Sequence, residues 1–195
     1  MDGSWQKVWN KVVGKYAGSL DLSCIQIDGT HTPAKRGGES VGYQGRKKSK
    51  TTNMLLLTDS QGIRLAISRP MAGNHHDAYK LNEHFNSMLQ MLEKSSVPTQ
   101  GLFLNADAGF DTREFRKLCS SREIIANIVE NGRKSKNKQG KYVFDRLLYK
   151  YRFAIERTNA WLDAFKAILV RFETQDETWK SLWLLAFTVI LLRKL

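Results

Sequence analysis

The sequence predicts one α/β domain, built on a five-stranded mixed sheet flanked by helices. The chain has 195 residues, 42% of them hydrophobic, which is enough to bury one full-sized core. Three strand-like segments follow one another in the first third of the chain, and a turn sequence joins the last two. Beyond them, segments with helical and with strand-like patterns alternate, which is typical of an α/β fold.

The first 50 residues predict a helix, a strand and a loop. Apolar residues at helical spacing over 5–17 indicate a short amphipathic helix. Residues 20–28 alternate in the manner of a strand, which we expect to end at Asp28. Residues 33–50 are rich in glycine and in positive charge, and they predict a loop.

A hairpin and a helix come next. Residues 51–58 and 63–68 are apolar strand candidates, and residues 59–62 between them have the composition of a tight turn. A helical pattern then runs from 78 to 94. Asp77 precedes it directly, so we expect its carboxylate to cap the first turn.

The second half of the chain alternates between strands and helices. The predicted elements are a buried strand over 101–106, a helix over 112–121, a strand over 124–129, an exposed basic loop over 131–141, a helix that begins near 144–145 and runs through 149–166, and a helix over 177–193. Asp111 and Glu114 have the spacing of a capping box at the first of these helices. Three hairpin-linked strands followed by alternating helices and strands are what a mixed-sheet ribonuclease H-like domain shows.

The predicted helix over 149–166 has two different faces. Its polar face carries Tyr149, Arg152, Glu156, Asn159 and Asp163 at steps of three or four residues. Its apolar face carries Leu148, Tyr151, Ile155, Leu162, Phe165 and Leu169, which we expect to face the core. Two interpretations stay open: a surface helix with an ordinary Arg152–Glu156 pair, or a helix that holds Glu156 rigidly over a site.

Charge and cysteine content narrow the classes of partner and compartment. Lys and Arg outnumber Asp and Glu by 31 to 19, which gives a net charge of +12. This charge predicts a polyanionic partner, and it favours nucleic acid over an anionic membrane surface. Two cysteines far apart in the sequence exclude a disulfide framework and favour a reducing cytoplasm. The most hydrophobic run, Leu182 to Leu192, would span only about 16 Å as a helix, against a bilayer core of about 30 Å. We therefore expect no membrane partner.

Three carboxylates stand out as candidate catalytic residues. Asp28 and Asp107 follow predicted strands, and they would meet at one edge of the sheet if those strands are neighbours. Glu156 would then reach them from its helix. Three converging carboxylates repel one another unless a cation neutralises them, and oxygen ligands select Mg²⁺ or Mn²⁺. Two such ions, bridged by Asp28 and Asp107 with Glu156 completing the shell of the second, would suit cleavage of a phosphodiester in DNA or RNA.

The three acids and their surroundings resemble the DDE transposases of bacterial insertion sequences. Tyr149, Arg152 and Glu156 match the Tyr-x2-Arg-x3-Glu part of their signature. Further similar segments are IDGTHT around Asp28, GRKKSKTTNMLLLTDSQG before the hairpin turn, GNHHDA at 73–78, NADAGFD around Asp107 and ERTNAWLDAFKAILVRFE from Glu156 onward. The resemblance covers nearly all of residues 20–173, and it looks closest to the insertion-sequence-five group.

This resemblance implies a ribonuclease H-like DDE catalytic domain over residues 20–195, with residues 1–19 as an N-terminal helix left from a DNA-binding region. The chain would then be a second-frame product or a truncated copy. The implied activity is metal-dependent DNA strand cleavage and strand transfer. The implied partners are double-stranded DNA, as element ends and as target, and further copies of the chain in a homodimer or higher oligomer. The implied place is the bacterial cytoplasm, at the nucleoid.

The resemblance also suggests supporting residues. Tyr149 and Arg152 would orient Glu156 or grip the DNA backbone, His31 would support the site or touch a phosphate, and His76 and Asp77 match a family motif. The residues expected to contact DNA phosphates are Arg46, Lys47, Lys48, Lys50, Arg133, Lys134 and Lys136. One departure is Asp163, which stands where the signature has a basic residue, while Lys166 lies three positions further on.

Two other functions stay open at this point. A ribonuclease H-like nuclease without strand transfer would use the same three carboxylates. A DNA-binding remnant that no longer reacts is favoured by Asp163 and by the missing N-terminal region.

Overall fold

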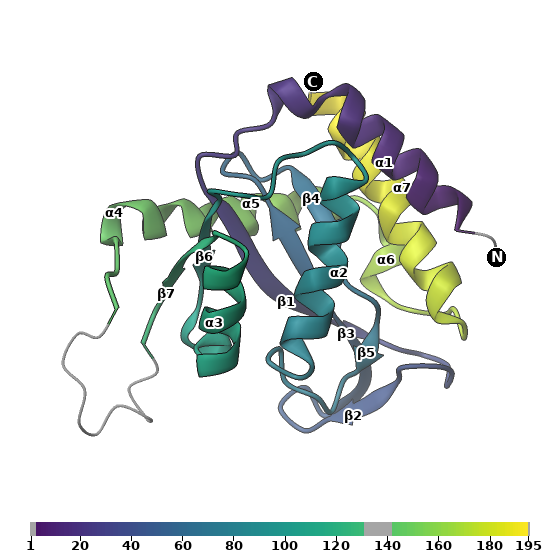
Figure 1. Cartoon of the computed structure of the whole chain (residues 1–195). Coiled ribbons are helices and arrows are strands. Elements are labelled where there is room, and N and C mark those ends of the chain that lie inside the picture. The colour runs from purple at the N-terminus through teal and green to yellow at the C-terminus, as the bar shows by residue number, and fades with distance from the viewer. Residues whose placement is uncertain (1–2, 131–141, 195) are drawn as a thin grey trace.

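The structure is a computed structural model that describes residues 3–130 and 142–194, and it forms a curled sheet with helices on both faces (Figure 1). The strands are β1 (Ile25–Pro33), β2 (Gly42–Gln44), β3 (Ser49–Thr58), β4 (Arg64–Ile67), β5 (Met71–Ala72), β6 (Phe103–Ala106) and β7 (Ile125–Ile128). The helices are α1 (Ser4–Lys15), α2 (Leu81–Glu93), α3 (Arg113–Ser121), α4 (Arg146–Tyr149), α5 (Phe153–Leu162), α6 (Lys166–Leu169) and α7 (Asp176–Lys194), with short 3₁₀ turns η1 (Ala17–Ser19), η2 (Ala108–Phe110) and η3 (Lys150–Arg152).

The sheet is mixed, as predicted. Its strand order is β2-β3-β1-β6-β7, and β4 and β5 pair with β3. β1 is antiparallel to β3 and parallel to β6, which is parallel to β7. This mixed sheet flanked by helices confirms the α/β, ribonuclease H-like class. Within the part of the chain that the structure describes, the sheet has seven strands rather than the predicted five. The two additional strands, β2 and β5, are too short to give an alternating pattern.

The first strand lies further along the chain than predicted. Residues 20–28 were expected to form it, but β1 runs over Ile25–Pro33, so Asp28 is inside the strand and not at its end. The strand continues because β3 pairs with it from Gln26 to Pro33. Its second half is only partly buried, so it lacks the apolar alternation that identifies a strand in sequence.

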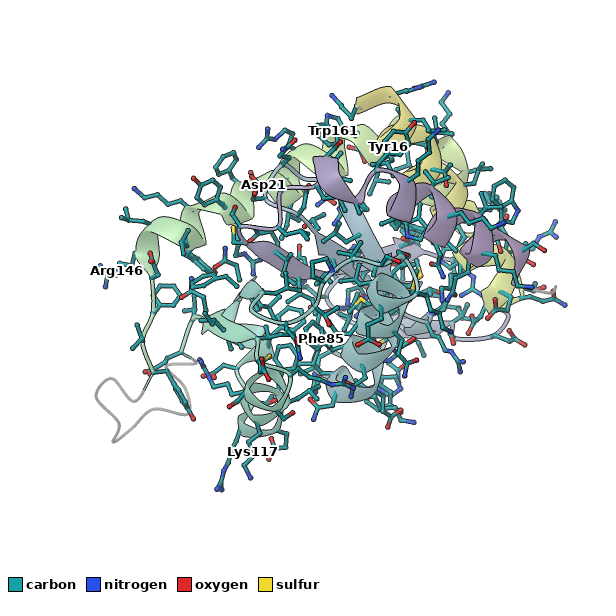
Figure 2. The ribbon with its side chains drawn as sticks, turned by 45° about the horizontal axis from the view of Figure 1, so that its top comes forward. Tyr16, Asp21, Phe85, Lys117, Arg146 and Trp161 are labelled. Atoms are coloured by element: carbon teal, nitrogen blue, oxygen red, sulfur yellow. The ribbon has the colours of Figure 1, made fainter. Side chains whose placement is uncertain are left out.

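The helices form layers on the two faces of the sheet. α2 and α3 cover one face, and α5 crosses the other (Figure 1). Phe85 of α2 is fully buried and its ring lies 5.1 Å from that of Phe115, whereas Lys117 and Arg146 point away from the core (Figure 2). α1 packs beside α7, where the ring of Trp9 lies 5.7 Å from that of Phe187. The N-terminal helix therefore belongs to the same core.

The long helix predicted over 149–166 is divided. It begins at its N-cap Asp145, passes through the 3₁₀ turn η3 and ends at Leu162. Phe165, with φ −100° and ψ 82°, separates it from α6. Its expected apolar face is therefore interrupted: Ile155 and Leu162 are buried, but Tyr151 is 44% exposed.

Two smaller predictions have clear outcomes. The hairpin turn at 59–62 is confirmed, with the Asp59 carboxylate accepting the N–H groups of Gln61 and Ile63. The capping box is wrong: Thr112 caps α3 through a hydrogen bond from Phe115 N–H, because the Asp111 carboxylate is paired with Arg116 at 2.7 Å.

Cys24 and Cys119 are both free and buried, in agreement with the absence of a disulfide framework. Within residues 3–130 and 142–194, none of the helices combines the length and the apolar character needed to cross a membrane. The predicted loop at 131–141 lies outside the described residues.

Candidate active site

The strand register places two of the candidate acids side by side. β1 and β6 are parallel neighbours with Gln26 opposite Asn105, so two residues further along the same register Asp28 comes opposite Asp107. β6 ends at Ala106, while β1 continues to Pro33. The two carboxylates therefore lie where β6 stops and leaves one edge of β1 open, the kind of place at which ligands bind to α/β sheets.

Burial and charge both act on Asp28. Removal from water raises the pKa of its carboxyl group, and the charges of Asp107 and Asp77 raise it further. The Arg152 guanidinium and the Gly29 N–H act against this rise in pKa. Arg152 Nη2 lies 3.7 Å from Asp28 Oδ1. The Asp28 site thus concentrates negative charge for which one arginine compensates only in part.

Asp107 is oriented by the backbone that follows it. Its Oδ1 accepts the Gly109 N–H at 2.7 Å, which caps the 3₁₀ turn η2. Phe110, at the end of that turn, is fully buried. The turn therefore fixes the carboxylate directly beyond the end of β6.

Tyr149 and Arg152, the two residues of the signature that precede the glutamate, lie at the same place. The Arg152 guanidinium is over the Tyr149 ring, 5.6 Å from its centroid. Burial raises the pKa of the Tyr149 hydroxyl, Arg152 lowers it, and the charges of Asp107 and Asp28 raise it. Both side chains are therefore within electrostatic range of the aspartates.

Glu156 lies outside this group. It is exposed on α5, where Ala154, Ile155 and Thr158 are buried. Among the described residues, no three His, Cys, Asp or Glu side chains come together as a group that could hold a metal. The structure thus brings together Asp28, Asp107, Tyr149 and Arg152, while Glu156 is exposed to solvent on α5.

His31 and Asp77 meet on the opposite face of β1. His31 Nε2 lies 3.8 Å from Asp77 Oδ1, which also accepts a hydrogen bond of 2.7 Å from Asn53 Nδ2. The capping prediction for Asp77 is therefore wrong: α2 begins only at Leu81, and the Asp77 carboxylate points to the sheet instead. A Cβ atom on Gly29 would overlap this carboxylate. Burial lowers the pKa of His31, which favours the neutral ring, although Asp77 acts in the opposite sense.

Comparison with known proteins identifies the family. A family model described as "Transposase DDE domain" matches residues 19–192. The chain belongs to this family. A comparison with the sequences of curated proteins gives no match.

The solved structures that are similar include other transposases. The piggyBac transposase synaptic complex with hairpin DNA superposes with a TM-score of 0.55 at 11% identity, over 87% of this chain and 46% of that one. This likeness supports the fold, and the chain spans about half the length of that protein. The catalytic domain of Mos1 mariner transposase matches with a TM-score of 0.39 at 12% identity, over 100% of this chain and 95% of that one.

Basic residues of this DDE transposase domain gather near one end of β1. Lys47 Nζ donates to the His31 carbonyl at 2.7 Å, and Arg46 and Lys48 are exposed in the same turn between β2 and β3. Lys50 is exposed on β3. His76 is also exposed and lies in the loop before α2. Arg133, Lys134 and Lys136 lie outside the described residues.

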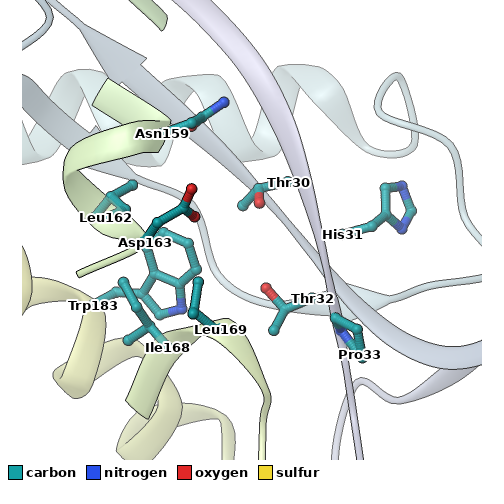
Figure 3. Close-up of a pocket in the computed structure, with 10 residues that line it drawn as sticks. All are labelled: Thr30, His31, Thr32, Pro33, Asn159, Leu162, Asp163, Ile168, Leu169 and Trp183. Carbon is teal, nitrogen blue, oxygen red and sulfur yellow. The ribbon is translucent and has the colours of Figure 1, made fainter. Parts of the chain in front are cut away.

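A small cavity lies beside β1, further along the strand from Asp28. Its volume is about 150 Å³, and Thr30, Asn159, Asp163 and Trp183 are among the residues that line it (Figure 3). Asp163, which replaces the basic residue of the family signature, thus faces a cavity between α5 and the strand of Asp28.

Sequence reasoning missed two sets of buried polar residues, one in contact with α5 and one in contact with the start of α4. Arg64 is 2% exposed, and its Nη2 donates to Asn159 Oδ1 at 2.7 Å. Gln26, Asn105 and Asn127 are also buried, on three neighbouring strands. The available signal was a polar residue inside each otherwise apolar strand segment, which indicates a specific partner for a buried polar group.

Proposed function

We propose that this chain is the catalytic domain of a DDE transposase that cleaves DNA at the ends of an insertion sequence and transfers the freed strand to target DNA. The observation that supports this proposal most directly is the position of Asp28 and Asp107, which lie in matching register on adjacent parallel strands. Arg152 and Tyr149 lie beside them. Family membership supports the same activity. The segments that resemble the insertion-sequence-five group support that subgroup.

The two aspartates fit a divalent cation by their chemistry. Mg²⁺ binds through one or two carboxylates together with water and substrate phosphates, and Asp28 and Asp107 provide two carboxylates whose mutual repulsion a cation would relieve. We propose Mg²⁺ or Mn²⁺ at this place, in a two-ion site with Glu156 as the third carboxylate. The ions would supply Lewis acidity for phosphodiester cleavage.

The side chains around the acids would bind and orient the DNA. Arg152 partly neutralises Asp28 and would contact a backbone phosphate, and Tyr149 would fix the direction of the guanidinium through its ring. The exposed cations of the β2–β3 turn would hold the duplex through its phosphates. His31, His76 and Asp77 would support that end of β1.

We further propose a division of the chain and an assembly. Residues 20–195 would form the catalytic domain, and residues 1–19 would be what remains of a DNA-binding region, with α1 packed on α7. The acting form would be a homodimer or higher oligomer on double-stranded DNA, in the bacterial cytoplasm.

Removal of single carboxylates tests the catalytic proposal. Asp28→Asn, Asp107→Asn and Glu156→Gln should each abolish Mg²⁺-dependent nicking of DNA that carries the element ends, while binding is retained. Glu114→Gln is the matched control, because Glu114 is an exposed acid on α3. Nicking by Asp107→Asn at the wild-type rate would refute the assignment. If the protein nicks DNA but does not join pre-cleaved ends to a target, its activity is that of a nuclease without strand transfer.

A second candidate function is DNA binding without cleavage. The observation that favours it is that, among the described residues, the exposed Glu156 does not form a group of potential metal ligands with Asp28 and Asp107. Salt-dependent DNA binding by the wild-type chain, without nicking in Mg²⁺ or in Mn²⁺, would support this candidate.

A further inference from the structure

Three buried amide side chains form a continuous row beneath the helix of Glu156. Gln26 on β1, Asn105 on β6 and Asn127 on β7 are opposite one another in the parallel register. Asn127 Nδ2 donates to Asn105 Oδ1 at 2.7 Å, and Asn105 Nδ2 donates to Gln26 Oε1 at 2.9 Å. None of the three is more than 1% exposed. We call this row the amide ladder.

The ladder also binds the first turn of α4. Asn105 Nδ2 donates to the Leu148 carbonyl at 2.8 Å, and Asn127 Nδ2 donates to the Asp145 carbonyl at 2.9 Å. Asn127 Oδ1 in turn accepts the Asp145 N–H at 2.8 Å. Each NH₂ group of the two asparagines thus uses both of its hydrogens, one within the ladder and one on the helix. If the Asn127 amide were flipped, its NH₂ group would face the Asp145 N–H, and two donors would oppose each other. The hydrogen bonds therefore determine the orientation of the Asn127 amide.

The ladder lies directly beside the two aspartates. Side chains two residues apart on a strand point to the same face, so Gln26 shares a face with Asp28, and Asn105 shares one with Asp107. The same two strands therefore present the acids and hold the start of the helix. Asp145 adds a side-chain cap, since its Oδ1 accepts the N–H groups of Leu147 and Leu148.

The far end of the helix is held as well. Thr158 donates from its hydroxyl to the Gly62 carbonyl, and Asn159 accepts from Arg64. Arg152 and Glu156 lie between these two attachments. Apolar contacts alone would allow the helix to slide or rotate over the sheet, whereas hydrogen bonds at both ends select one position.

We propose that Gln26, Asn105 and Asn127 are positioning residues that set where Arg152 and Glu156 stand relative to Asp28 and Asp107. The ladder touches none of the reacting groups. It acts through the backbone of 145–148, and its value for catalysis rests on the function proposed above. Loss of one of the three amides should therefore loosen the helix and slow the cleavage step, while DNA affinity changes little, because the exposed cations of the β2–β3 turn would still hold the duplex.

Asn105→Leu tests this role, because leucine has a similar volume and no hydrogen-bonding group. Its control is Met88→Ala, which removes a fully buried side chain of α2 on the opposite face of the sheet. Both are compared with the wild type where circular dichroism shows complete folding. Amide hydrogen exchange over 146–156, DNA affinity, and the nicking rate at saturating DNA with Mg²⁺ are measured.

Asn105→Leu should raise exchange over 146–156 at least tenfold and lower the nicking rate at least tenfold, with DNA affinity within twofold. Met88→Ala should do neither. The proposal is overturned if Asn105→Leu and Met88→Ala show equal amide hydrogen exchange over 146–156, or if they nick DNA at equal rates. If the wild type does not nick DNA, the proposed function fails, and the exchange data still decide whether the ladder holds the helix. If Asn105→Leu does not fold, Asn127→Leu, which removes only the outer rung, is judged by the same criteria.

Discussion

The Asp59 carboxyl group makes the stability of this domain depend on pH. The side chain is fully buried in the β3–β4 turn, and burial raises its pKa from 3.8 to about 6, even though the N–H groups of Ile63, Asp21 and Gln61 act against the rise. Protonation is thus easier in the folded than in the unfolded chain. The resulting stabilisation is full below pH 3.8 and is lost as the pH rises through about 6.

The size of the effect follows from the pKa difference. At about 1.4 kcal/mol per pKa unit, the shift of roughly two units is worth about 3 kcal/mol in total, of which about 2 kcal/mol falls between pH 4.5 and 7.5. Asp59→Asn removes the titration while keeping an oxygen for the turn. Urea unfolding of both proteins across this range gives the difference in unfolding free energy, wild type minus variant, in which other titrating groups cancel.

That difference should fall by about 2 kcal/mol as the pH rises from 4.5 to 7.5. If the difference in unfolding free energy changes by less than about 0.5 kcal/mol over this pH range, water reaches the Asp59 carboxylate in the turn. A difference that grows with pH would mean that the N–H donors outweigh burial. Either result would refute the reasoning about Asp59.

Three further predictions concern single contacts. Arg171 is 1% exposed and its Nη1 donates to Thr52, so Arg171→Met should lower the unfolding free energy by about 3–5 kcal/mol, and a loss below about 1 kcal/mol in urea unfolding would contradict a buried network there. Gly29→Ala should cost about 1–3 kcal/mol because the new methyl group overlaps Asp77, and the double variant with Asp77→Ala should recover most of that loss in thermal unfolding. Lys47→Gln should weaken DNA binding and reduce the slope of log affinity against log salt by about 1, and an unchanged slope in a titration would remove Lys47 from the phosphate contacts.

Local signals in the sequence were sufficient for some elements. The turn at 59–62 was predictable because Asp59 and Gly62 supply a backbone-capping side chain and a positive φ within a few residues. The apolar strands on either side follow from composition. α7 was found almost to the residue, because its apolar seam is long and uninterrupted.

Other features depend on contacts between distant segments. Residues 29–33 gave no strand signal, since most of their side chains are only partly buried, and pairing with β3 makes them a strand. Helical periodicity predicted the polar face on which Glu156 is exposed, but it could not predict whether that residue meets Asp28 and Asp107, because this depends on how the helix packs on the sheet. The choice of Thr112 over Asp111 as cap was decided by Arg116, a partner that the capping pattern does not consider.

β1 carries different chemistry on its two faces, and this limits how the strand can pair. Asp28 points to the α5 side, and Gly29 and His31 point to the side of Asp77. Because alternate residues change face, a slip of one residue against β3 would turn Asp28 towards Asp77 and bring two carboxylates together without a cation. The continuous pairing from Gln26 to Pro33 makes such a slip costly along the whole strand. Substitutions that weaken β3 far from Asp28 should therefore produce misaligned, inactive molecules before they produce unfolded ones.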